Sequence, residues 1–117
     1  MPAVLRQAVR SDLPELFRVR SAVSENRQPS LTLPEDQVIE ALETTGRGWL
    51  IEVDGVTVAF AIGNALTGSI WALFVDPQHR GRGYGRRLYD TVVEWLWSQG
   101  TVAPGATHSH ALDEDAP

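Results

Sequence analysis

The sequence predicts a mixed α/β domain whose elements follow the order β-α-α-β-β-β-α. Three strand-like runs succeed one another between residues 49 and 75, with short turn signals between them. Apolar residues at helical spacing lie before these runs, over residues 12–20 and 34–42, and after them, over residues 83–99. A chain of 117 residues has room for one hydrophobic core, and hence for one domain.

The first two elements are a strand and a helix. Residues Val4 to Val9 alternate between apolar and polar side chains, which is typical of a strand with one buried face. Ser11 or Asp12 can cap the helix that follows, because either side chain can accept a hydrogen bond from an unpaired N–H group of the first turn. Residues 26–30 then form a polar break that contains a proline.

The second helix is predicted to begin near Pro34. Thr32 and Glu35 stand three residues apart, which is the spacing of a capping box. Gly46 to Gly48 is predicted to end this helix, because glycine disfavours helical backbone.

Three strands are predicted to form an antiparallel meander. Trp49 to Val53 is the first, and Asp54-Gly55 is a strong signal for a two-residue hairpin turn. Val56 to Leu66 returns, and Thr67-Gly68 makes the next turn. The third strand, Ser69 to Val75, is almost wholly apolar, so we expect both of its faces to be covered.

The last predicted element is a helix from about Gly83 to Gln99, which Gly100 ends. Residues 1–100 are therefore predicted to form the folded domain. Residues 101–117 form an atypical polar and acidic tail.

Composition argues against several classes of function. The formal net charge is −5, whereas a nucleic-acid binder normally has a basic excess. The absence of cysteine excludes disulfides and thiolate metal sites. We predict no metal site, since His108 and His110 are the only close histidine pair and stand in the polar tail. No apolar run has the length of a membrane helix or a signal peptide, so we predict no membrane partner and a cytoplasmic location.

A glycine-rich loop between the third meander strand and the last helix is the best candidate for a binding site. The start of a helix presents unpaired N–H groups and a partial positive charge, which suit a phosphate if no bulky side chain blocks the approach. Glycine stands at the three positions where such an approach is needed, and arginines flank them: Gly81, Gly83 and Gly85, with Arg80, Arg82, Arg86 and Arg87.

Two other glycine motifs do not fit this loop. A P-loop needs a lysine, and the sequence contains none. A dinucleotide-binding fingerprint needs a third glycine where Arg86 stands, and an acidic residue about 20 positions further on, near Ala103. The loop therefore favours a different diphosphate ligand.

The segment from Val75 to Leu88 resembles the coenzyme A motif of the GNAT family of N-acetyltransferases. In that motif an apolar strand end is followed by Asp-Pro and then by Gln/Arg-x-x-Gly-x-Gly/Ala at the start of a helix. Arg80, Gly83 and Gly85 occupy its three defining positions. The order of elements resembles that of the family as well, so the resemblance extends over roughly residues 4–100.

The resemblance implies an acetyl-CoA site and an amine acceptor, either a small molecule or a peptide. Main-chain groups of one strand segment would bind the pantetheine arm: Leu73, Phe74 and Val75. Backbone N–H groups of the loop would surround the pyrophosphate: Gly81, Arg82, Gly83, Tyr84, Gly85 and Arg86. Glu25 and Asn26 fall where family members often line the acceptor pocket, although they could equally form a polar helix end.

The sequence departs from the family pattern after the last helix. A complete GNAT domain continues with a strand, a helix and a hairpin, and its general-acid tyrosine commonly lies there. The only tyrosines here are Tyr84 and Tyr89, so the catalytic residues stay unknown. The sequence therefore predicts a shortened GNAT-like core that is either an N-acetyltransferase or a non-catalytic domain that binds acyl-CoA or a protein.

The last helix also predicts self-association. Its apolar residues from Leu88 to Trp97 cover an arc of roughly 200°, about twice what one sheet covers. Because this surface needs a second cover, we expect a homodimer or a larger homo-oligomer.

Overall fold

The computed structural model describes residues 3–25 and 35–100 and confirms the mixed α/β class. Four strands form one antiparallel sheet in the order β1-β2-β3-β4. These strands are β1 (Ala3–Gln7), β2 (Gly46–Val53), β3 (Val56–Asn64) and β4 (Ser69–Val75). The helices are α1 (Leu13–Glu25), α2 (Glu35–Glu43) and α3 (Tyr84–Gln99), with short 3-10 turns η1 (Arg10–Asp12) and η2 (Pro77–His79).

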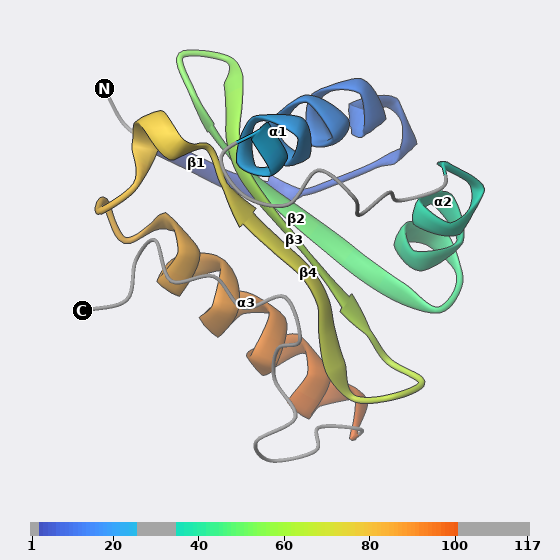
Figure 1. The fold of residues 1–117 in the computed structure, drawn as a ribbon. Coiled ribbons are helices and arrows are strands. Elements are labelled where there is room, and N and C mark those ends of the chain that lie inside the picture. The colour runs from blue at the N-terminus through green and yellow to red at the C-terminus, as the bar shows by residue number, and fades with distance from the viewer. Residues whose placement is uncertain (1–2, 26–34, 101–117) are drawn as a thin grey trace.

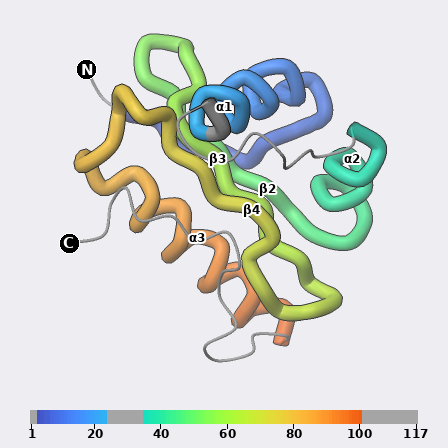
Figure 2. The backbone as a smooth tube through the Cα atoms, in the orientation of Figure 1, coloured from blue at the N-terminus to red at the C-terminus, as the bar shows by residue number. Residues whose placement is uncertain are grey.

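The sheet separates two layers of helices. Helices α1 and α2 lie on one face and α3 lies on the other, where it runs alongside β4 (Figures 1 and 2). Each face has its own apolar cluster, with Phe60 and Leu50 on the α1/α2 side and Ile51 and Val75 on the α3 side. Both faces of the sheet are covered, which explains why β3 and β4 are so apolar.

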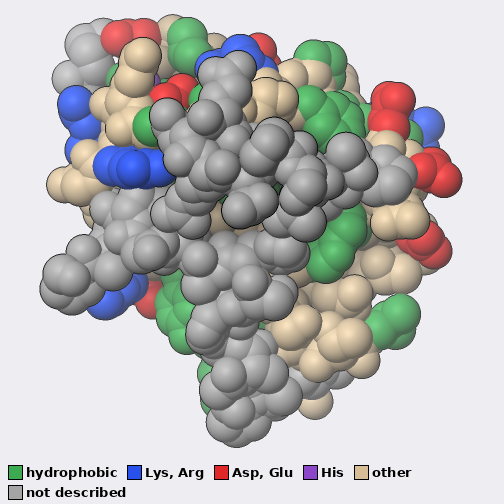
Figure 3. Space-filling model, viewed as in Figure 1, with side chains coloured by type: hydrophobic (Ala, Val, Ile, Leu, Met, Phe, Trp, Pro, Cys, Tyr) green, Lys and Arg blue, Asp and Glu red, His purple; other side chains and the backbone are tan. Residues whose placement is uncertain are grey.

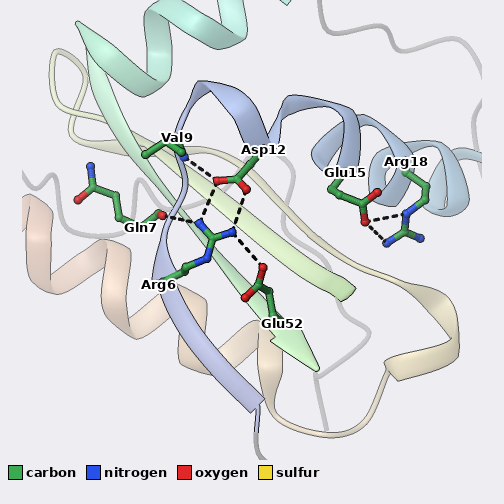
Figure 4. Close-up of polar contacts among 7 residues, drawn as sticks. All are labelled: Arg6, Gln7, Val9, Asp12, Glu15, Arg18 and Glu52. Atoms are coloured by element: carbon green, nitrogen blue, oxygen red, sulfur yellow. Dashed lines mark hydrogen bonds and ion pairs between the residues drawn. The ribbon is translucent and has the colours of Figure 1, made fainter. Parts of the chain in front are cut away.

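Asp12 joins the start of α1 to the sheet. Its carboxylate accepts hydrogen bonds from the Val9 N–H at 2.8 Å and from the Arg6 guanidinium at 2.9 and 3.0 Å. Arg6 also donates to Glu52 of β2 at 2.9 Å (Figure 4). Of the two predicted caps, Asp12 therefore makes the capping contact, although it caps η1 rather than α1 itself.

We expect Asp12→Ala to lower the free energy of unfolding by about 2 kcal/mol at pH 7, because it breaks charge-assisted hydrogen bonds at a carboxylate that is 13% exposed. The hydrogen bonds from Arg6 lower the pKa of Asp12 below its ordinary value of about 3.9. The contribution is therefore complete above that value and is lost as the pH falls through the lowered pKa. Urea unfolding at pH 7 and at pH 2.5 measures both effects.

Glu43→Ala is the matched control for Asp12→Ala. Glu43 also pairs with an arginine, Arg10, at 2.7 Å, but both side chains are exposed. We expect little loss of stability at either pH, since exposed ion pairs contribute little. Equal losses for the two variants at pH 7 would contradict the role assigned to Asp12.

The Asp54-Gly55 turn is confirmed. Both residues have positive φ, 56° and 78°, as a type I′ hairpin turn requires. The four residues from Ala65 to Gly68 form the second turn, so β3 ends at Asn64, two residues before the predicted end.

The predicted role of Gly46 to Gly48 is wrong. Helix α2 ends at Glu43, and these residues begin β2, three residues before the predicted start of that strand. The glycines serve close packing: a Cβ on Gly46 would lie 1.8 Å from the carbonyl oxygen of Gly63 in β3. Thr32 of the predicted capping box lies outside the described residues.

The sheet covers more of α3 than the sequence predicted. Leu88, Val92 and Leu96 are buried, and three further residues of the predicted excess arc pack against the same cluster: Tyr89, Val93 and Trp95. Trp95 lies edge-on to Trp49 with 5.6 Å between the ring centroids. Trp97 alone among the large apolar side chains of α3 is strongly exposed, at 61%.

Candidate functional site

Strand β4 leads into the candidate site. Leu73 and Val75 are buried on the α3 side of the sheet, whereas Phe74 points to the opposite face and lies 5.5 Å from the ring of Phe60. In the sheet that the described residues form, β4 is the edge strand. The side of β4 away from β3 is therefore where an extended ligand could pair with backbone groups.

A β-bulge interrupts β4 at Trp71. Ile62 pairs with Ala72 while the next residue of β3, Gly63, pairs with Ile70, so Trp71 is the extra residue. A bulge bends its strand and changes the direction of a side chain. Trp71 is half-buried and packs against the cluster under α1 and α2.

Asp76 anchors the loop that follows β4. Its backbone N–H donates to the Val58 carbonyl at 2.8 Å, and its carboxylate accepts from the Gln78 N–H at 2.9 Å. The Arg18 guanidinium of α1 lies 3.7 Å from the same carboxylate and donates a hydrogen bond to the Thr57 carbonyl. The start of the loop is therefore held by both α1 and β3.

Two glycines shape the loop itself. Gly81 and Gly83 have φ of 77° and 82°, in the left-handed region that favours glycine. A Cβ on either residue would meet nothing within 4 Å, so this side of the loop faces open space. Gly83 is the N-cap of α3 but has no side chain to cap it, and the first turn of α3 contains no acidic residue. The positive end of this helix therefore lacks a negatively charged neighbour in its own first turn.

The loop is surrounded by exposed arginines: Arg80, Arg82, Arg86 and Arg87. None of them forms an ion pair with another described residue, whereas Arg6, Arg10 and Arg18 all pair with carboxylates. In the space-filling view, basic side chains gather at the left edge of the molecule, on the side where the loop and the start of α3 lie (Figure 3). This arrangement suits a ligand that carries several negative charges.

The other residues singled out from the sequence do not come together into a catalytic set. Tyr84 and Tyr89 pack against the apolar cluster on the α3 side. Glu25 ends α1, but its side chain lies outside the description, as does all of Asn26. The described residues hold no group of three His, Asp or Glu side chains that could bind a metal ion.

The family model described as the acetyltransferase (GNAT) family matches residues 7–112. The chain belongs to the GNAT family. The match includes the whole of the glycine loop and the strands β2, β3 and β4, so it supports the resemblance that the sequence itself shows. No curated protein matches the chain closely enough to add to this assignment.

Solved structures share the fold of this GNAT domain at low sequence identity. An acetyltransferase of the GNAT family from Staphylococcus aureus has a TM-score of 0.71 and 22% identity, over 86% of this chain and 70% of that one. The PaiA N-acetyltransferase from Thermoplasma acidophilum, solved with coenzyme A, has a TM-score of 0.70 and 12% identity, over 86% and 76%. The ribosomal-protein-S18-alanine N-acetyltransferase from Escherichia coli has a TM-score of 0.68 and 20% identity, over 86% of this chain and 63% of its own length.

The GNAT domain has two features at the site that sequence reasoning missed. One is the anchor from Arg18 to Asp76, which joins residues 58 positions apart in the sequence, and the other is the bulge at Trp71. The proline after Asp76 signalled only the turn that begins the loop, since Asp before Pro favours the start of a turn. None of the described helices is long and apolar enough to cross a membrane.

Proposed function

We propose that this chain transfers the acetyl group of acetyl-CoA to an amine acceptor. The observation that carries the proposal is the start of α3, which faces open space, has no side-chain cap and is flanked by four exposed arginines. Membership of the GNAT family supports the same conclusion.

The residues of the loop fit the diphosphate of coenzyme A. Gly81 and Gly83 leave space beside the loop, so the phosphates can approach the start of α3 closely. The edge of β4 from Leu73 to Val75 would bind the pantetheine arm as an additional strand would. The thioester would then lie beside the middle of β4.

The transfer itself needs two proton movements. A neutral amine attacks the thioester carbonyl, the new C–N bond forms and the C–S bond breaks. The amine nitrogen loses a proton, and the departing thiolate gains one. We assign none of the described side chains as a general acid or base for these steps, and we propose that solvent or a second subunit moves these protons.

Titration calorimetry with acetyl-CoA tests the binding step. We expect a dissociation constant in the micromolar range, as is common for enzyme substrates. Free coenzyme A should compete, since both ligands carry the same phosphates. Absence of heat together with absence of competition would contradict the proposed site.

A thiol-release assay tests the transfer step. The chain contains no cysteine, so a thiol reagent detects only the coenzyme A that is set free. The acceptor panel should include small amines and peptide N-termini, because one structurally similar protein acts on the alanine of a ribosomal protein. Binding without release across the panel would favour the alternative, a non-catalytic acyl-CoA-binding domain.

The homodimer and the cytoplasmic location are also proposals. The exposed Trp97 and the edge of β4 support self-association. Sedimentation velocity at micromolar concentration tests it: we expect a species of twice the chain's 12.9 kDa, which the Trp97→Ser variant should weaken. A monomer at all concentrations would contradict the proposal.

A further inference from the structure

Arg20 differs from every other arginine in the described part of the chain. The others either pair with carboxylates, lie over a tryptophan ring as Arg47 does, or are exposed around the phosphate loop. Arg20 is only 9% exposed and forms no ion pair with a described residue. Its Nη2 atom is buried without a hydrogen-bond partner.

The position of Arg20 places it in the layer between α1 and the sheet. It belongs to the buried side of α1 together with Leu16, Val19 and Val23. Helix α1 packs on β3 and β4, on the face opposite to α3. Trp71 and Phe74 of β4 are half-buried on that same face. Arg20 therefore belongs to the side of α1 that faces the strand along which the thioester would lie.

A buried guanidinium without a partner is unfavourable. Removing a charge from water is costly unless an opposite charge and hydrogen bonds compensate. Burial lowers the pKa of Arg20, but arginine keeps its proton at physiological pH. An anion that accepts a hydrogen bond from Nη2 would compensate for this cost.

Nearby parts of the chain offer few anions. Residues 26–34, which connect α1 to α2, contain no aspartate or glutamate. Glu15, five residues earlier in α1, already accepts hydrogen bonds from Arg18 at 3.0 and 3.1 Å (Figure 4). A carboxylate from a bound molecule has the planar shape that a guanidinium binds with two parallel hydrogen bonds.

We propose that Arg20 binds a carboxylate of the acceptor, so that the preferred acceptors are amines that also carry a carboxylate. That the bound carboxylate belongs to an acceptor rests on the proposed acetyl transfer. The inference specifies the chemical class of the acceptor and identifies Arg20 as the residue that selects it.

Product analogues test the inference without requiring turnover. A panel of N-acetyl amino acids and their matching amides isolates the carboxylate, since N-acetylglycine and N-acetylglycinamide differ only there. We expect at least one acid in the panel to bind the wild-type protein about tenfold or more tightly than its amide, as a lost charge-assisted pair implies. Affinities are measured by calorimetry with and without coenzyme A.

The Arg20→Met variant should abolish this preference, giving equal affinities for acid and amide, while coenzyme A binding stays within about twofold of wild type. Its melting temperature should rise, since an apolar side chain replaces an unpaired buried charge. Arg10→Met is the matched control, because it removes the same charge from an exposed arginine. It should keep the preference for acids.

Three results would overturn the inference. The first is equal binding of acid and amide by a wild-type protein that binds coenzyme A; failure to bind coenzyme A would instead contradict the proposed function. The second is an Arg20→Met variant that keeps the preference. The third concerns the triple change of Asp113, Glu114 and Asp115 to amides. If this change lowers the stability of the wild type but not that of the Arg20→Met variant, Arg20 binds a carboxylate of the chain's own tail.

Discussion

Replacing Gly83 with tryptophan is expected to weaken acetyl-CoA binding by about a hundredfold or more while leaving the fold intact. Gly83 stands at the start of α3 with φ of 82°, and a Cβ there would meet nothing within 4 Å. A large side chain would therefore start in open space and fill the region in which we place the diphosphate. Losing two charge-assisted hydrogen bonds costs about 3–6 kcal/mol, which corresponds to at least a hundredfold in affinity.

The control for this variant is Gly100→Trp at the other end of the same helix. Gly100 also has positive φ, 74°, and open space around its Cβ position. Both variants therefore carry a similar backbone strain of about 1–2 kcal/mol. They differ in position, because the 16 residues of α3 separate them by about 24 Å.

Calorimetry with acetyl-CoA and thermal unfolding should be measured on both variants. We expect similar decreases in melting temperature and a loss of affinity for Gly83→Trp alone. If Gly83→Trp binds acetyl-CoA as well as wild type does, the phosphates do not lie at this helix start. If Gly100→Trp loses affinity equally, the effect comes from destabilised structure.

Local signals explain why most of the fold could be predicted. The Asp54-Gly55 turn fixes the hairpin between β2 and β3, because its two residues accept positive φ. The apolar run from Ile70 to Val75 is a strand with two covered faces, as its composition indicates. The loop before α3 was predicted for the same reason, since a glycine-rich segment between a strand and a helix is contiguous in the sequence.

Long-range contacts explain what the sequence did not reveal. Helical spacing already indicates that Arg20 belongs to the buried face of α1, but it does not indicate that Arg20 lacks an ion pair there or that Arg18 reaches Asp76. Both facts depend on how α1 crosses β3 and β4. The excess apolar arc of α3 was misjudged in a similar way, because Trp95 packs on Trp49 of a strand that is distant in the sequence.

Gly46 shows how a local signal can mislead. Glycine after a helical pattern commonly ends the helix. Glycine also allows two backbones to approach closely, but the neighbouring residues in the sequence do not indicate this second role. In the structure Gly46 pairs with Asn64 at the start of β2, and a Cβ would lie 1.8 Å from the Gly63 oxygen and 2.9 Å from the Ala41 oxygen. Backbone atoms on two sides therefore exclude any side chain.

Gly46→Ala is accordingly expected to lower the free energy of unfolding by about 3 kcal/mol or more, because the backbone must move to relieve the overlap. Gly63→Ala is the graded comparison. Its Cβ would lie 2.6 Å from the Val92 Cγ1, a side-chain atom that can shift, so we expect a smaller loss of about 1 kcal/mol. Urea unfolding of both variants measures the difference. A smaller loss for Gly46→Ala than for Gly63→Ala would mean that β2 begins after Gly46, as the sequence pattern alone had suggested.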